Sequence, residues 1–287
     1  MKKVVFWFIF GAFTFWGCKG KPDDRQVMIV FSTQSLSSSV LKSSVNPDED
    51  LISKVILFGV DAQGKVVDRF PVETSPPTTG ITLSISDQVK SFYAVANLSN
   101  TSETANLSSA TDLMNLTGDF ANAPRTPLLM GGNANVNGSN IEIVMIRAVA
   151  KIEITGKNGF VIESVTVTNT PNRGYVFKQA SRLVPPSAAM ISYPKINGKD
   201  PSFYVAENAK SSSTQFVVTG TFEGKQASYT FPLSQNKVII DIERNKFYQV
   251  EVSPESPTEC NISITIPGWD EVNADEVIIP DEYFDEP

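Results

Sequence analysis

The sequence of 287 residues contains no histidine. Its absence excludes Ser-His-Asp and Cys-His nucleophile systems and every histidine-based metal site. Cysteine is also scarce, with only Cys18 and Cys260. Cys260 begins an alternating, strand-like pattern, CNISITI, so we expect it to be a buried structural thiol rather than a reactive one.

The sequence has few charged residues, and acidic residues outnumber basic ones. Charged residues make up 19% of the chain and the net charge is −7, without a dense basic patch, which argues against nucleic acid as a partner. Hydrophobic residues make up 41%, and 18 prolines and 17 glycines supply turns, a composition typical of a globular protein. The length of 287 residues suggests about two domains.

Catalytic and metal-binding patterns are also missing. Most carboxylates lie in loops or in the tail, and no pair stands on rigid elements as glycoside hydrolysis requires. The acidic tail, Asp270–Pro287, lacks the glycine-containing spacing of an EF-hand, although calcium binding by it stays open. Gly131-Gly132 is not followed by the Lys-Ser/Thr of a phosphate-binding loop. We therefore predict no enzyme activity, no metal site and no cofactor.

The N-terminus has the pattern of a targeting segment. Lys2 and Lys3 precede an apolar run, Val4–Phe15, that is too short to span a bilayer comfortably. Gly17-Cys18 resembles the end of a lipobox, although Trp16 departs from the usual pattern. We expect residues 1–18 to be a lipoprotein signal peptide, Cys18 to carry the lipid, and residues 19–26 to form a tether. The alternative is an ordinary secretory signal.

Strand-like runs fill most of the remaining chain. The first, Gln26–Ser32, alternates Val27, Ile29 and Phe31 with Met28 and Val30, so both faces are expected to be buried. A long Ser-rich loop, Thr33–Asp50, follows it. The longest run, Ile141–Thr155, is mostly β-branched with sparse polar residues, which indicates a strand shared between two sheets.

These patterns predict an all-β fold of two transthyretin-like, Greek-key β-sandwiches in tandem. The domains are expected at residues 27–146 and at residues 147–287, which include the acidic tail, and they should meet near Ile146; the alternative is one large sandwich. Four local expectations follow from turn and helix signals. They are a hairpin of 53–60 with 65–70, a hairpin of 151–155 with 163–168, a short helix within 102–117 capped by Ser108 or Ser109, and a loop over 123–140.

Six short motifs occur in a characteristic order along the chain. One is Arg147–Ile152, with the pattern R-x-x-A-K-I. The others are Phe92–Asn97 (FYAVAN), Pro127–Gly132 (PLLMGG), Thr166–Pro171 (TVTNTP), Phe203–Asn208 (FYVAEN) and Arg244–Tyr248 (RNKFY). Together they resemble the fimbrillins of the Bacteroidota, the subunits of type V pili, whose signature is R-x-x-A-K-I/V and in which the other segments have the same order.

The resemblance implies a lipid-anchored fimbrial subunit that acts in pilus assembly and cell adhesion. Its partners would be other fimbrial subunits, the outer membrane through the lipid, and a host or bacterial surface ligand. The acidic pair Asp23-Asp24 resembles the export signal that sends such lipoproteins to the cell surface. The alternative is a surface lipoprotein that binds a glycan or host protein without polymerising.

In the family, as the resemblance implies, a protease cuts the loop after the first strand, and a strand donated by a neighbouring subunit fills the vacated groove. The displaced strand here would be that of Val27, Ile29 and Phe31. The donor would come from the tail, where Val277, Ile278 and Ile279 are apolar. The family's best-known cut follows arginine, whereas the only basic residue in this loop is Lys42, so either another protease cuts there or the subunit stays uncut as an anchor or terminal piece.

Overall fold

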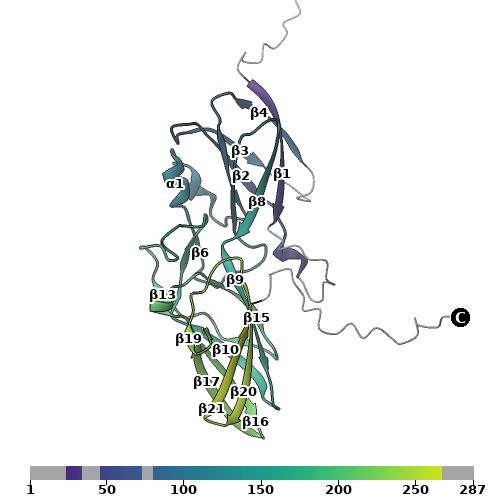
Figure 1. Cartoon of the computed structure of the whole chain (residues 1–287), viewed down its shortest axis with the longest axis vertical. Coiled ribbons are helices and arrows are strands. Elements are labelled where there is room, and N and C mark those ends of the chain that lie inside the picture. Colours follow the sequence, from purple (N-terminus) through teal and green to yellow (C-terminus); the bar gives the residue numbers. More distant parts are fainter. Residues whose placement is uncertain (1–23, 34–45, 73–79, 267–287) are drawn as a thin grey trace, which may run out of the picture.

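The computed structural model describes residues 24–33, 46–72 and 80–266. Almost all regular structure within these ranges is β-strand, in two tiers that follow one another along the long axis (Figure 1). The upper tier begins with β1 (Asp24–Thr33) and ends with β8 (Asn140–Arg147). The lower tier begins with β9 (Val149–Gly156) and ends with β21 (Glu259–Thr265). The predicted all-β class is confirmed.

The upper tier is a seven-stranded sheet that wraps around one hydrophobic core. Its other strands are β2 (Val55–Val60), β3 (Val66–Val72), β4 (Ile81–Ser86), β5 (Ser91–Ala96) and β7 (Met130–Asn135). The strand order is β3-β2-β5-β7-β8-β1-β4. Strand β2 is buried along its whole length, as its apolar sequence VILFGV requires.

The predicted hairpin of β2 and β3 is confirmed, and its turn shows why it forms. The Asp61 carboxylate accepts hydrogen bonds from the backbone N–H groups of Gln63, at 2.9 Å, and Lys65, at 2.8 Å. Gly64 has φ of +80°, a conformation that costs other residues a steric penalty.

Strand β1 differs from its prediction in two ways. Val27, Ile29 and Phe31 are buried, but Met28 is 42% exposed, so only one face of the strand is buried. No further layer of the described residues covers the outer face, so Met28 is in contact with solvent. The strand also starts earlier than expected: Asp24 and Arg25, assigned to the tether, pair with Ser86 and Ile85 of β4.

The chain crosses from the upper to the lower tier at Ala148. The long run at 141–155 contributes β8 to one sheet and β9 to another, as expected for a shared strand, with a break between Arg147 and Val149. Ala148 and Val149 pack in the first core, whereas Ala150 begins the second. The crossing therefore lies slightly beyond Ile146, and the assignment of residues 27–146 and 147–287 as separate domains stays a prediction.

The lower tier contains two four-stranded sheets that enclose the second core. One has the order β14-β10-β16-β17 and the other β15-β9-β20-β21. Their bounds are β10 (Val161–Thr168), β14 (Ile196–Asn197), β15 (Ser202–Ala206), β16 (Gln215–Phe222), β17 (Lys225–Pro232) and β20 (Phe247–Ser256).

The predicted hairpin of 151–155 with 163–168 is wrong. Strand β9 pairs with β15 and β20, whereas β10 pairs with β14 and β16, so the two segments lie in different sheets. The turn at Asn158, with φ of +54°, and Gly159, with φ of +80°, has the expected turn chemistry. It carries the chain from one sheet to the other instead of reversing it within one sheet.

Short elements complete the fold, and two expectations about them change. The predicted helix shrinks to α1 (Ala110–Met114), capped by Ser109 in a capping box with Asp112. Hydrogen bonds from Ser108 hold the pKa of Asp112 below its ordinary value. The region 123–140, expected to be a loop, contains β7. The remaining elements are β6 (Thr117–Asp119), β11 (Thr170–Pro171), β12 (Arg173–Tyr175), β13 (Met190–Ile191), β18 (Ser234–Gln235), β19 (Val238–Ile239), η1 (Pro47–Glu49), η2 (Thr101–Thr104) and η3 (Lys210–Ser212).

Cys260, expected to be buried, is only partly buried and carries a free thiol. It lies on β21, a strand at the edge of its sheet that has no fully buried residue. Partial burial raises the pKa of its thiol, so the group is not activated as a nucleophile. Among the described residues, the helices are all too short or too polar to cross a membrane.

Candidate functional site

Strand β1 lies in a slot between β4 and β8, two strands that run in opposite directions to each other. It pairs antiparallel with β4, and parallel with β8 from Met28 opposite Asn140 to Thr33 opposite Met145. Val27, Ile29 and Phe31 fill the inner side of the slot with exposed fractions of 1%, 0% and 2%. If this strand left, two rows of backbone donors and acceptors and an apolar trough would become available to another strand.

The structure thus brings together the three candidate residues of the displaced strand. The other predicted site residues lie outside the described residues. They are Cys18 for the lipid, Lys42 for processing, and Val277, Ile278 and Ile279 for the donor.

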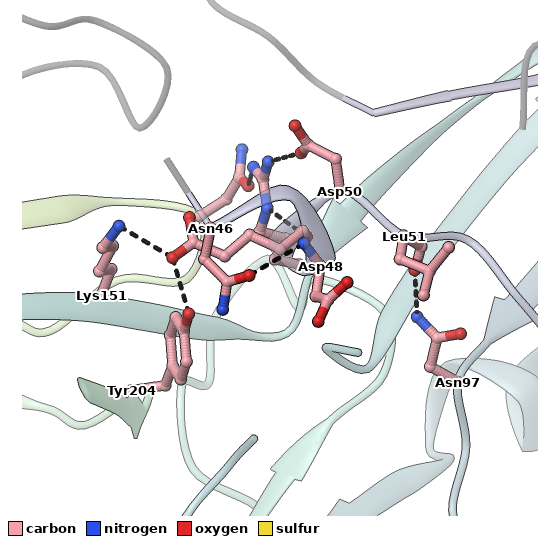
Figure 2. Close-up of polar contacts among 10 residues, drawn as sticks. Asn46, Asp48, Asp50, Leu51, Asn97, Lys151 and Tyr204 are labelled. Atoms are coloured by element: carbon pink, nitrogen blue, oxygen red, sulfur yellow. Dashed lines mark hydrogen bonds and ion pairs between the residues drawn. The ribbon is translucent and has the colours of Figure 1, made fainter. Parts of the chain in front are cut away.

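The last residues of the predicted processing loop, Asn46–Asp50, are fixed at the junction of the two tiers (Figure 2). The side chain of Asn46 caps η1 by accepting a hydrogen bond from the backbone N–H of Asp48 at 3.1 Å. Glu49 points into the junction and is 1% exposed. Its Oε1 accepts a hydrogen bond from the Tyr204 hydroxyl at 2.7 Å and lies 2.8 Å from Nζ of Lys151.

Arg147 holds the same segment from the other side. Its side chain is fully buried. Nε donates to the backbone carbonyl of Glu49 at 3.2 Å, and Nη1 donates to Oδ1 of Asn245 at 2.9 Å. Nη2 forms an ion pair with the Asp50 carboxylate. A buried guanidinium is tolerated because its donors are used by a carboxylate, a carbonyl and an amide.

The electrostatics of this cluster keep Tyr204 protonated. Burial, followed by its hydrogen bond to Glu49 and the negative charge there, raises the pKa of Tyr204. The hydroxyl therefore remains a donor to Glu49 at physiological pH. Lys151 also lies 5.2 Å above the ring of Phe247, which gives its ammonium a second favourable contact. We call the contacts of Arg147, Lys151 and Tyr204 with Glu49 and Asp50 the junction clamp.

A second buried ion pair lies at the same junction. Arg244 donates from Nε to Oε2 of Glu207 at 2.7 Å, and both side chains are almost completely buried. The guanidinium also donates to the backbone carbonyls of Val176 and Tyr175, each at 2.8 Å. Tyr175 belongs to β12, which pairs with β6, a strand that precedes β8 in the sequence. The Arg244–Glu207 pair therefore joins segments from before and after the crossing at Ala148.

Close backbone packing completes the junction. A Cβ atom on Gly131 would lie 2.6 Å from the carbonyl oxygen of Val176, so the position requires glycine. Asn208 donates to the backbone carbonyl of Asn169 at 3.1 Å and to the hydroxyl of Thr214 at 3.0 Å. The motifs that carry the family resemblance thus converge on the junction.

Sequence reasoning identified these motifs but did not place them together. Glu49 and Asp50 were assigned to the long loop Thr33–Asp50, and Glu207 and Arg244 were not considered as a pair. One signal was available: Arg147 and Lys151 interrupt an otherwise apolar strand, and charges at such positions are buried only when they are paired. Among the described residues, no group of three or more acidic or cysteine side chains could hold a metal ion.

Comparison with known proteins identifies the family. A sequence profile described as fimbrillin-A associated anchor proteins Mfa1 and Mfa2 matches residues 32–275. A search of curated protein sequences gave no match.

Similar solved structures include two from Porphyromonas gingivalis and one from Parabacteroides distasonis. The tip fimbrial protein Mfa3 of Porphyromonas gingivalis, with C-terminal truncation, has a TM-score of 0.59 at 14% identity, over 85% of this chain and 100% of that one. A fimbrilin (FimA) of the same species has a TM-score of 0.60 at 14% identity, over 86% and 98%. A fimbrial assembly protein of Parabacteroides distasonis has a TM-score of 0.57 at 18% identity, over 85% and 99%. These likenesses show a shared fold over nearly the whole length of each relative. The family match, which spans most of the sequence, shows that this chain is a structural protein of cell-surface fimbriae rather than an enzyme, and that it belongs to the fimbrillin-A associated anchor protein family.

Proposed function

We propose that this chain is a lipid-anchored fimbrial subunit whose β1 slot accepts a strand from a neighbouring subunit. The observation that carries the proposal is the position of β1. It lies between β4 and β8, it buries three alternate apolar side chains, and it is followed by the predicted processing loop. A donated strand would gain both rows of backbone hydrogen bonds and the same three apolar sites.

The other parts of the proposal come from the sequence. Cys18 would carry the acyl chains that hold the subunit on the outer membrane, and Lys42 would be the processing position. Val277, Ile278 and Ile279 would supply apolar side chains of the donor, with Val277 and Ile279 on the same face of the strand. Other fimbrial subunits are therefore the expected partners, in a homopolymer or a heteropolymer.

A module that binds a surface ligand without polymerising is supported less well. Two adjoining hollows of about 480 and 470 Å³ flank residues 122–125. Phe120 lines the first hollow, but it is only 4% exposed and presents no free face for stacking on a sugar or peptide.

A reversible disulfide between β1 and β4 tests the proposal. Met28 and Thr82 are directly opposite one another on the exposed face of this antiparallel pair, a separation that a disulfide can bridge. We would purify the Met28→Cys/Thr82→Cys variant without residues 1–18 and with Cys260→Ser, treat it with trypsin, and identify the new N-terminus. Unboiled gels would then show whether ladders form.

The expected result is a ladder under reducing conditions and monomer when the disulfide is closed, because β1 then cannot leave. The matched control is Thr219→Cys/Ser228→Cys, which joins β16 to β17 at a pair whose hydroxyl oxygens are 3.3 Å apart. This control should form ladders in both states. Deletion of Asp275–Pro287 should abolish them. Ladders from the closed Met28/Thr82 variant would refute replacement of β1.

A further inference from the structure

The junction clamp lies directly beyond the end of the β1 slot. Thr33, the last residue of β1, is opposite Met145 on β8. Two residues further along β8, Arg147 binds Asp50 and the backbone of Glu49. The chain therefore leaves the slot opposite Met145 and is bound again two residues further along β8, by Arg147.

The fastened segment extends beyond the ion pairs. Asn97 donates to the backbone carbonyl of Leu51 at 2.8 Å, and its Oδ1 accepts the backbone N–H of Ser53 at 3.1 Å (Figure 2 shows the first contact). Ile52 between them is completely buried. Residues 46–53 are thus held by side chains of β8, β9, β15 and the segment after β5, all of which lie outside β1.

We propose that the junction clamp retains residues 46–53 when β1 leaves, so that this segment forms a fixed end wall of the slot. The proposal rests on the release of β1 proposed above and assigns a role to the Arg and Lys of the R-x-x-A-K-I signature. Only the strand before the cut is exchanged, while the segment after it stays bound by the same contacts.

The end wall has a consequence for the incoming strand. Pairing with β8 extends over six residues, from Asn140 to Met145. Beyond Met145, the side chain of Arg147 is already bound to the backbone of Glu49 and to the carboxylate of Asp50. A donated strand can therefore advance only to this point, and a stop of this kind fixes which of its residues face the apolar sites. A slip of one residue would turn its apolar side chains outward.

Hydrogen exchange of the intact chain tests the clamp without any cut. Glu49→Gln keeps the shape of the side chain but removes the charge that faces Lys151, and Tyr204→Phe removes one hydrogen bond in case the first variant folds poorly. Exchange of the amides of residues 49–53 should accelerate by about tenfold or more in Glu49→Gln, because a buried ammonium is left unpaired and the segment opens locally. Amides of β2 should be unchanged.

The matched control is Glu103→Gln, which removes a partly exposed ion pair with Arg173. It should leave the exchange of residues 49–53 unchanged. Exchange in Glu49→Gln and Tyr204→Phe that equals the exchange of the native chain would overturn the clamp, whether or not β1 is ever replaced.

Trypsin then tests retention. In the native chain, cleavage after Lys42 should stop there, with residues 46–53 as protected as before the cut. In Glu49→Gln, trypsin should proceed to the exposed Lys54, because protease access requires the segment to unfold locally. Loss of protection at 46–53 in the cut native chain, or equal cleavage at Lys54 in both proteins, would overturn retention. If residues 46–53 stay protected but β1 does not leave the cut chain, the result would count against strand replacement and not against the clamp.

Discussion

The buried pair of Arg244 and Glu207 allows the energy of the junction to be measured. The side chains of Arg244 and Glu207 are 2% and 3% exposed. The Arg244 guanidinium donates hydrogen bonds to the Glu207 carboxylate and to the backbone carbonyls of Val176 and Tyr175. Arg244→Met removes all of them and leaves Glu207 as a buried charge without its ion-pair partner. Breaking a buried ion pair in this way costs about 3–5 kcal/mol.

The expected loss can be followed by urea and thermal unfolding of the chain without residues 1–18. At roughly 2–4 °C for each kcal/mol in a chain of this size, the melting temperature should fall by about 6–20 °C. The double variant Arg244→Met/Glu207→Gln removes the unpaired charge but keeps an oxygen that can accept the backbone N–H of Arg244. It should therefore recover at least about 1 kcal/mol relative to Arg244→Met.

An exposed pair supplies the control. Lys157 and Glu251 are 2.9 Å apart, with side chains about half exposed, and Glu251→Gln should change the free energy of unfolding by at most about 1 kcal/mol. Arg244→Met with an effect as small as this control, or a double variant less stable than the single one, would refute the argument that Arg244 compensates a buried charge.

Four further expectations follow. Gly131→Ala should destabilise the chain by about 1–3 kcal/mol in urea unfolding, because the new methyl group would meet a backbone carbonyl. Ser109→Ala should cost about 1 kcal/mol through the lost helix cap, and no change would contradict the capping box. Burial raises the pKa of Tyr193 and Tyr248 to about 12 each. The free energy of unfolding should therefore fall as pH rises from about 10 to 12, because these tyrosines ionise first in the unfolded chain. A free energy of unfolding that stays flat while tyrosinate absorbance rises at about pH 10 would contradict this. Cys18→Ala should release the protein from membranes or block its processing, and palmitate labelling that persists in this variant would exclude Cys18 as the lipid site.

Local turn and pattern signals predicted those parts of the fold that are decided locally. The hairpin at Asp61–Gly64 follows from a carboxylate and a glycine within four residues, and the Ser109 cap from a polar side chain before a short apolar run. The turn at Asn158-Gly159 was also recognised, but the strands on either side do not pair. Turn chemistry reverses the chain, whereas the sheet that each strand joins is decided by distant strands.

Strand β7 and the junction clamp were missed for different physical reasons. In β7, Gly131 and Gly132 resemble a loop, but they are small because the backbone of other segments approaches them closely. Glu49 lies in an acidic, Ser-rich stretch with the composition of a solvated loop. Its burial depends on Lys151 and Tyr204, which are more than one hundred residues away, so no local pattern could indicate it.

The contrast between slot and junction explains which part of the chain the family motifs describe. The β1 slot requires only apolar side chains at alternate positions, and Val27, Ile29 and Phe31 are one of many combinations that would fill it. The junction instead requires particular groups, because a buried guanidinium or carboxylate is stable only with donors and acceptors at defined places. Arg147 and Arg244 meet that requirement with partners from segments that are far apart in the sequence. A motif such as R-x-x-A-K-I therefore identifies the geometry that joins the two tiers, whereas the strand that we propose is exchanged in assembly has only an alternating apolar pattern in the sequence.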